Sequence, residues 1–134
     1  MAEENVEILR RLYASWERGD MRTPDVWDVN VEVSWIGTET PGIAGEYRGV
    51  DELSAAMSRY LDALADLRIK AERIVDLDED RVLVLALHTA RGKTSGLGYE
   101  LEIGDLFTLR DGKIVRYVSY WDRAEALGAA GLAE

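Results

Sequence analysis

The hydrophobic positions in the first half of the chain recur every three or four residues, as they do along one face of an α-helix. The first stripe predicts an amphipathic helix that ends before the Arg-Gly-Asp segment at residues 18–20, and its members are Val6, Leu9, Leu12, Tyr13 and Trp16. A second stripe predicts another amphipathic helix, and its members are Val50, Leu53, Met57, Tyr60, Leu61 and Leu64.

Shorter signals lie between the two stripes. Thr23 followed by Pro24 is typical of a helix start, because Thr can cap and Pro fits the first turn, so a short helix is expected through Trp27. Residues 30–37 read as a strand. Residues 38–45 are rich in proline and glycine and predict an irregular loop, which we expect to act as a mobile flap over a pocket.

The second half of the chain alternates with the period of a β-strand. Four runs are separated by the turn sequences DED, GKTSG and RDGK, and these strands are expected at 67–77, 81–91, 97–110 and 113–121. The turns are too short for crossover helices, so the strands should pair antiparallel. We therefore expect one α+β domain over residues 1–134, in which helices cover one face of a long curved sheet.

Composition narrows the possible partners. The chain has 134 residues, of which 47% are hydrophobic and 31% charged, so it can bury a core. Its formal net charge of −10 argues against nucleic acid or an anionic membrane as the main partner and favours a small neutral or cationic one. There is no cysteine, the start does not resemble a signal peptide, and no apolar run is long enough to span a bilayer. A cytoplasmic location is expected.

One residue interrupts an otherwise apolar row. Along residues 99–109 every second side chain shares one face, and that face carries an aspartate among apolar and aromatic residues: Tyr99, Leu101, Ile103, Asp105, Phe107 and Leu109. Burying a carboxylate without a partner is costly. Asp105 is therefore the first candidate for a functional side chain, and we expect it to be buried with a raised pKa.

Several segments together resemble a known family. They are YASWERGD, VEVSWIG, YRGVDEL, GDLFTLRDGKIVRYVSYWD and RAEALGAAGL, and they are similar to the SnoaL-like branch of the NTF2-like superfamily over nearly the whole chain. The resemblance implies a cone-shaped fold, in which a curved antiparallel sheet wraps around N-terminal helices and encloses a mostly apolar pocket. It implies little about function, because the superfamily includes cyclases, isomerases, hydrolases, dehydratases and proteins that only bind.

The resemblance also suggests a role for Asp105. It falls where ketosteroid isomerase keeps a protonated aspartic acid that donates a hydrogen bond to the developing oxyanion. The oxyanion tyrosine would fall on Leu12, with Tyr13 one residue out of register, and the base would fall near Ser34. The arginine of limonene epoxide hydrolase would fall on Ile103. Neither of these two chemistries is therefore fully matched.

A structural interpretation of Asp105 stands beside the functional one. A β-bulge at Gly104 would shift the alternation and turn Asp105 to solvent, and an arginine from a neighbouring strand would neutralise it as a structural ion pair.

Asp122 and His88 are the other candidates for catalysis. In SnoaL-type cyclases an aspartate at the end of the last strand is the acid/base, and Asp122 resembles it, but Asp122 with Glu125 three residues later also fits a helix cap. His88 is the only histidine; it could exchange protons near an aspartate or simply be a hydrogen-bonded strand residue. A lone histidine makes no metal site, and no metal or cofactor is expected.

Aromatic side chains would line the pocket if they point inward, although most aromatics at such spacings are plain core. The expected ligand-contacting residues are Tyr13, Trp16, Trp35, Tyr60, Tyr99, Phe107 and Tyr120.

Two classes of function stay open. One is a cofactor-free isomerase, cyclase or dehydratase that acts on a hydrophobic carbonyl compound, with Asp105 as acid and Asp122 or His88 as base. The other is a noncatalytic domain that binds a small hydrophobic molecule. A homodimer is expected as well, because both faces of the last strand carry large apolar residues. Ile114, Val118 and Tyr120 lie on one face by strict alternation, and Val115, Tyr117 and Trp121 on the other.

Overall fold

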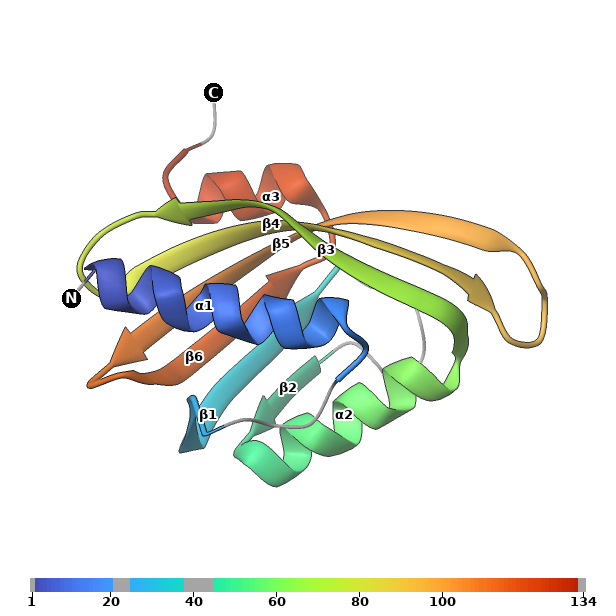
Figure 1. Ribbon diagram of the computed structural model, residues 1–134, viewed down its shortest axis with the longest axis horizontal. Coiled ribbons are helices and arrows are strands. Elements are labelled where there is room, and N and C mark those ends of the chain that lie inside the picture. Colours follow the sequence, from blue (N-terminus) through green and yellow to red (C-terminus); the bar gives the residue numbers. More distant parts are fainter. Residues whose placement is uncertain (1, 21–24, 38–44, 133–134) are drawn as a thin grey trace.

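The described residues of the computed structural model form three helices and one six-stranded sheet (Figure 1). The structure describes residues 2–20, 25–37 and 45–132. In chain order the elements are α1 (Ala2–Glu17), β1 (Trp27–Ile36), β2 (Gly45–Arg48), α2 (Val50–Asp62), β3 (Leu64–Asp76), β4 (Arg81–Gly92), β5 (Gly98–Arg110), β6 (Lys113–Tyr120) and α3 (Arg123–Ala129). The expected α+β fold is confirmed.

The sheet has the strand order β2-β1-β6-β5-β4-β3. The expected meander from β3 to β6 is confirmed, since each of these strands pairs antiparallel with the next. Among the described strands, one pair is parallel: β1 pairs antiparallel with β2 but runs parallel to β6. The last strand of the chain therefore lies in the middle of the sheet and joins its two halves.

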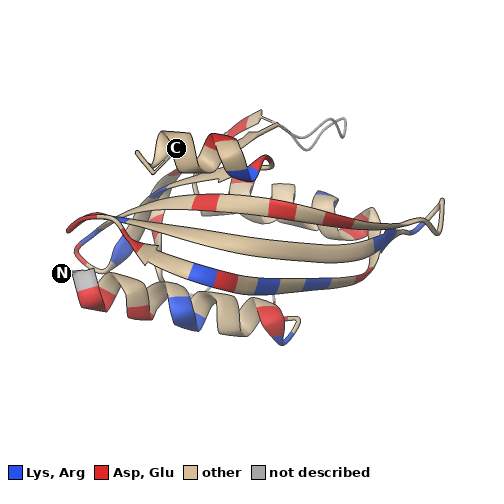
Figure 2. Cartoon of the chain, turned by 90° about the horizontal axis from the view of Figure 1, so that it is seen from above, with Lys and Arg blue, Asp and Glu red and all other residues tan. Residues whose placement is uncertain are grey.

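The two faces of the sheet are covered differently. The apolar face of α1 packs on the inner face, where Leu9, Leu12 and Tyr13 join the main core with residues of α2 and of the strands. In Figure 2 the strands lie between α1 and the C-terminal helix, and charged residues mark the outside of α1 and the edge strand β3. A second, smaller core forms under α3 and includes Leu83, Leu85 and Ala126.

The hairpins follow from their turn sequences. Asp111 and Gly112, between β5 and β6, both have positive φ, 52° and 77°, which is the requirement of a tight two-residue hairpin turn. The GKTSG sequence joins β4 to β5 as expected, and this hairpin projects beyond the rest of the sheet (Figure 1). These two turns fix the register of β5, the strand that carries Asp105.

β5 keeps its alternation at Asp105. Val84 and Ser119 lie opposite Asp105 on the two neighbouring strands, and the pairing with β4 is continuous on both sides of Gly104. The bulge that would have turned Asp105 to solvent is therefore absent. Asp105 is 1% exposed, and the expectation that it is buried is confirmed.

Gly104 faces the outside of the sheet, directly beneath α3. A β-carbon at Gly104 would overlap the β-carbon of Ala126, so the glycine allows the helix to approach the strand closely. At the start of α3, Arg123 pairs with Glu72 at 2.9 Å and with Glu102 at 3.1 Å. The helix is thus held on the outer face by close packing and by charge.

Two local predictions were wrong, and one lies outside the described residues. Trp27 opens β1 instead of closing a short helix; the start of that expected helix, residues 21–24, is not described. Ile114 packs in the main core beside Tyr117 rather than on the outer face with Val118, because the β5–β6 register shifts between Thr108 and Leu109. The expected flap falls almost wholly on residues 38–44, outside the described part.

Candidate functional site

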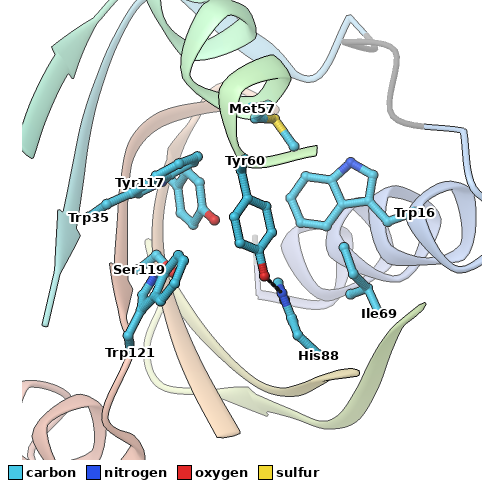
Figure 3. Close-up of a pocket in the computed structure, with 9 residues that line it drawn as sticks. All are labelled: Trp16, Trp35, Met57, Tyr60, Ile69, His88, Tyr117, Ser119 and Trp121. Carbon is cyan, nitrogen blue, oxygen red and sulfur yellow. Dashed lines mark hydrogen bonds between the residues drawn. The ribbon is translucent and has the colours of Figure 1, made fainter. Parts of the chain in front are cut away.

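A cavity lies inside the cone, between the inner face of the sheet and the two N-terminal helices. Six elements and the residue after β6 contribute side chains to it (Figure 3): Trp16, Trp35, Met57, Tyr60, Ile69, His88, Tyr117, Ser119 and Trp121. Trp35, Tyr60 and Trp121 contact one another, with ring centroids 5.3–6.4 Å apart. The walls are thus mostly aromatic, with a few polar atoms.

The cavity is small in this conformation. Its volume is about 20 Å³, which is room for about one or two water molecules. A larger molecule enters only if lining side chains move.

A buried acid and a tyrosine form the first polar cluster of the interior. The Tyr13 hydroxyl, from α1, donates a hydrogen bond to Asp105 Oδ2. Both residues are 1% exposed. The resemblance placed the partner tyrosine at Leu12, and the structure corrects this: Tyr13 is the residue that meets the carboxyl. Asp105 itself does not line the cavity but lies behind the wall formed by Ser119 and Tyr117.

Burial raises the pKa of Asp105 from 3.8 to about 6. The hydroxyls of Ser119, Tyr13 and Tyr117 oppose this rise because they favour the charged form. Asp105 Oδ1 has no hydrogen-bond partner within the described part of the chain, and none of the ion pairs found there involves this carboxyl. Asp105 is therefore an acid that titrates near neutral pH rather than half of a structural ion pair.

Tyr60 and His88 form the second polar cluster. The Tyr60 hydroxyl, from α2, lies 2.9 Å from His88 Nδ1 and 3.4 Å from the Tyr99 hydroxyl (Figure 3 draws the first contact). Burial lowers the pKa of His88 to about 4, so the imidazole is neutral at physiological pH. The interpretation of His88 as a hydrogen-bonded strand histidine is confirmed; its part in catalysis stays a prediction.

Two nitrogen atoms of the cavity wall are buried without a hydrogen bond. They are His88 Nε2 and Trp35 Nε1, and neither finds a partner among residues 2–20, 25–37 and 45–132. Unpaired buried polar atoms are uncommon in folded proteins. These two atoms are the places where the wall has hydrogen-bonding capacity left for another molecule.

The expected aromatic residues fall into three groups. Trp16, Trp35 and Tyr60 line the cavity, and Tyr99 touches its edge through Tyr60. Tyr13 and Phe107 are fully buried behind the wall, where Phe107 stacks on Tyr117 with centroids 4.9 Å apart.

Tyr120 was wrongly assigned to the pocket. It lies on the outer face and packs against the small core under α3. Strict alternation puts Tyr117, Ser119 and Trp121 on the inner face of β6, so Tyr120 points away from the cone.

Asp122 is a helix cap. Its Oδ1 accepts hydrogen bonds from the backbone nitrogens of Ala124, at 2.9 Å, and Glu125, at 3.3 Å. Its side chain is exposed and is not part of the cavity wall. The capping interpretation is confirmed, and a part for Asp122 in catalysis stays a prediction.

Other expectations for the site also change with the geometry. Ser34, where the resemblance placed a base, lines a hollow on the opposite face of β1 with Glu46 and Arg116. Five lining residues were missed: Met57, Ile69, Tyr117, Ser119 and Trp121. The alternation of the last three along β6 was a usable signal. The described residues contain no cluster of three or more acidic or histidine side chains that could hold a metal ion.

The cone-shaped fold with an enclosed interior is that of NTF2-like proteins, and comparison with solved structures agrees. An NTF2-like protein of unknown function from Burkholderia pseudomallei has a TM-score of 0.78 at 20% identity, over 93% of this chain and 95% of that one. An NTF2-like protein from Burkholderia xenovorans has a TM-score of 0.74 at 26% identity, over 97% of each chain. TerC, co-crystallised with polyporic acid, has a TM-score of 0.74 at 20% identity, over 96% and 98%.

A match between the sequence and a family model identifies the family. The model of the SnoaL-like domain matches residues 9–117, so the chain belongs to the SnoaL-like family. Among curated proteins, none matches the sequence. None of the described helices is long and apolar enough to cross a membrane.

Proposed function

We propose that the protein binds a small hydrophobic molecule in the interior of its cone. The observation that carries this proposal is the composition of the cavity wall: aromatic rings surround two buried nitrogens, Trp35 Nε1 and His88 Nε2, that have no partner among the described residues. Apolar walls with a few convergent polar groups are typical of small-molecule sites. A ligand with one or two oxygen atoms would bury its carbon skeleton and use those nitrogens.

TerC, which has the same fold, was crystallised with polyporic acid. This supports a small organic molecule as the kind of ligand, by analogy of fold only.

Calorimetric titration with 2-naphthol tests the binding proposal. Met57→Phe, on α2, would fill the cavity and should abolish binding, because Met57 lies in its wall. Ser58→Phe is the matched control, since Ser58 is exposed on the same helix and should leave binding unchanged. Equal binding of 2-naphthol by both variants would contradict an interior site. So would failure of the unmodified protein to bind either 2-naphthol or a smaller probe such as phenol.

Catalysis without a cofactor is the second candidate, and the Tyr13–Asp105 pair favours it. An acid with a pKa of about 6 can donate a proton or a hydrogen bond near neutral pH, and the Tyr13 hydroxyl, which donates to this carboxyl, holds it in place. Asp105 lies behind Ser119, so the wall must shift for the carboxyl to reach a substrate. The reaction would be isomerisation, cyclisation or dehydration of a carbonyl compound, with neutral His88 as the base.

Exchange of the α-protons of 2-tetralone in D2O, followed by NMR, tests for such activity. The unmodified protein should accelerate exchange, and Asp105→Asn should remove the acceleration while it keeps 2-naphthol binding. If the protein binds 2-naphthol but does not accelerate proton exchange of 2-tetralone, the result favours the noncatalytic function.

A further inference from the structure

Three polar side chains from three different elements form a hydrogen-bonded series that starts at the cavity wall. His88 stands on β4, Tyr60 on α2 and Tyr99 on β5. The Tyr60 hydroxyl is the middle member, 2.9 Å from His88 Nδ1 and 3.4 Å from the Tyr99 hydroxyl. His88 is 8% exposed, whereas Tyr99 is only partly buried. This series of hydrogen bonds therefore begins at a buried imidazole and ends at a tyrosine that is only partly buried.

This series can be satisfied in two ways, because each hydroxyl has one proton and can also accept one. In the first arrangement Tyr99 donates to Tyr60, and Tyr60 donates to Nδ1, so the ring proton is on Nε2. In the second, Nδ1–H donates to Tyr60, and Tyr60 donates to Tyr99, so Nε2 carries a lone pair. Both arrangements keep every member hydrogen-bonded and uncharged.

The His88 end of this series of hydrogen bonds faces the cavity. His88 lines it, and Nε2 is buried with no partner among the described residues. Nε2 therefore presents a donor to a carbonyl oxygen in the first arrangement and an acceptor to a hydroxyl in the second. An uncharged oxygen can fill this unpaired hydrogen-bonding capacity at little electrostatic cost, whereas none of the described lining residues is a cation that could neutralise a carboxylate.

We propose that His88 Nε2 binds the oxygen of an uncharged ligand, and that Tyr60 and Tyr99 relay protons between His88 and solvent. This inference rests on the proposed function of the cone as a ligand site. When a bound hydroxyl gives its proton to Nε2, the Nδ1 proton passes to Tyr60, the Tyr60 proton to Tyr99, and the Tyr99 proton to water. No charged imidazole forms. The ligand oxygen carries a negative charge only until the reverse sequence returns a proton from water, and during that time Nε2–H donates a hydrogen bond to it, so the ligand is uncharged before and after the exchange.

The electrostatic setting explains why a relay is needed. Burial disfavours the imidazolium form of His88, and burial also raises the pKa values of Tyr60 and Tyr99. Asp105 raises the pKa of Tyr60 slightly further. An isolated buried imidazole would therefore hold an extra proton poorly at neutral pH, and the relay removes that obstacle because a proton leaves as another arrives.

Nuclear magnetic resonance of the ligand-free protein tests the relay directly. His88 is the only histidine, so a sample labelled with 15N at histidine gives one imidazole whose nitrogen shifts report the tautomer. We expect Tyr99→Phe to slow exchange of the imidazole N–H proton with water about tenfold, because one hydrogen-bonded step to solvent is lost. Tyr60→Phe should also move the Nδ1 shift, since it removes the partner of that nitrogen. Tyr120→Phe, the same change on the outer face, is the control.

The outcomes separate the relay from the binding proposal. Unchanged proton exchange in Tyr99→Phe would overturn the relay, whatever the protein binds. On addition of 2-naphthol the Nε2 shift should change; 2-naphthol bound with an unaltered Nε2 shift would overturn His88 as the oxygen-binding residue. Failure to bind 2-naphthol or phenol with a normal relay would contradict the proposed function alone. Should Tyr60→Phe fail to fold, the partly buried Tyr99 still gives the decisive variant.

Discussion

The Tyr13 hydroxyl on α1 donates a hydrogen bond to Asp105 on β5, across 92 positions of sequence. This contact joins the first helix to the middle of the sheet inside a fully buried environment. A hydrogen bond to a charged carboxylate is stronger than one to a neutral acid, so the tyrosine and the titration of the aspartate are coupled.

Replacement of Tyr13 by Phe should raise the pKa of Asp105 above its value of about 6, because a hydroxyl that favours the charged form is lost. The carboxyl carbon of Asp105, followed by NMR during a pH titration, measures this. The ring packing on Trp16 and Phe107 is kept, so the fold should survive. An unchanged pKa would mean that Tyr13 has no influence on the acid.

Asp105→Asn should change how stability depends on pH. The folded protein holds a proton on Asp105 between pH 3.8 and about 6, where the unfolded chain has lost it, so the unmodified protein is destabilised as pH rises through that range. A shift of about two pKa units corresponds to ~3 kcal/mol. Urea unfolding from pH 3.5 to 8 should show that Asp105→Asn lacks this loss and is the more stable protein at pH 8.

Asp122→Asn is the control for that titration, because Asn is an equally good cap and Asp122 is exposed. It should follow the pH dependence of the unmodified protein. The same loss of stability in Asp105→Asn as in the unmodified protein would contradict a proton bound at residue 105.

Gly104→Ala should push α3 away from the sheet, since the new β-carbon would overlap that of Ala126. Overpacking of this kind typically costs about 1–3 kcal/mol. Chemical unfolding measures the cost, and the double variant Gly104→Ala with Ala126→Gly should recover part of it, because the two changes meet at one contact. Additive losses in the double variant would show that the contact is not the cause.

We propose a homodimer that uses the part of the outer sheet face left open by α3. The helix already covers Leu83 and Leu85, so the available surface is the β1–β6 side, where Ile36 is 40% exposed and Arg116 also faces outward. Light scattering at micromolar concentration should give twice the chain mass, and Ile36→Asp should reduce it to a monomer. A monomer mass for the unmodified protein would mean that α3 alone covers enough of the outer sheet face.

Sequence patterns predicted the parts of the site that depend on a single strand. The alternation along β5 was enough to predict that Asp105 is buried, because strand period and tight turns fix which way each side chain points. The partner of Asp105 could not be found in the same way. Leu12 and Tyr13 are both buried, and which of them reaches β5 depends on the rotation of α1 against the sheet, which is a tertiary property.

Both faces of β6 carry large apolar residues. Alternation therefore groups Tyr117, Ser119 and Trp121 on one face but does not show that this face is the inner one. The inner face packs in the main core and the outer face lies partly under α3, so Tyr120 was mistaken for a pocket residue. A register shift between β5 and β6, beyond Thr108, also places Ile114 on the inner face, in the main core. Trp27 followed a good helix start and nevertheless opens a strand, because its parallel partner is Ile114, 87 positions later.

The central place of β6 has a consequence for how the protein is made. β1 and β2 pair only with each other until residues 113–120 arrive, since β6 is the strand that connects them to β5. A two-stranded ribbon is at best marginally stable in water. During synthesis, then, α1, α2 and β3–β5 can associate early, whereas β1 and β2 remain an incomplete edge until β6 has left the ribosome. Chaperones that shield exposed edges should therefore matter most for nascent chains that stop short of residue 113.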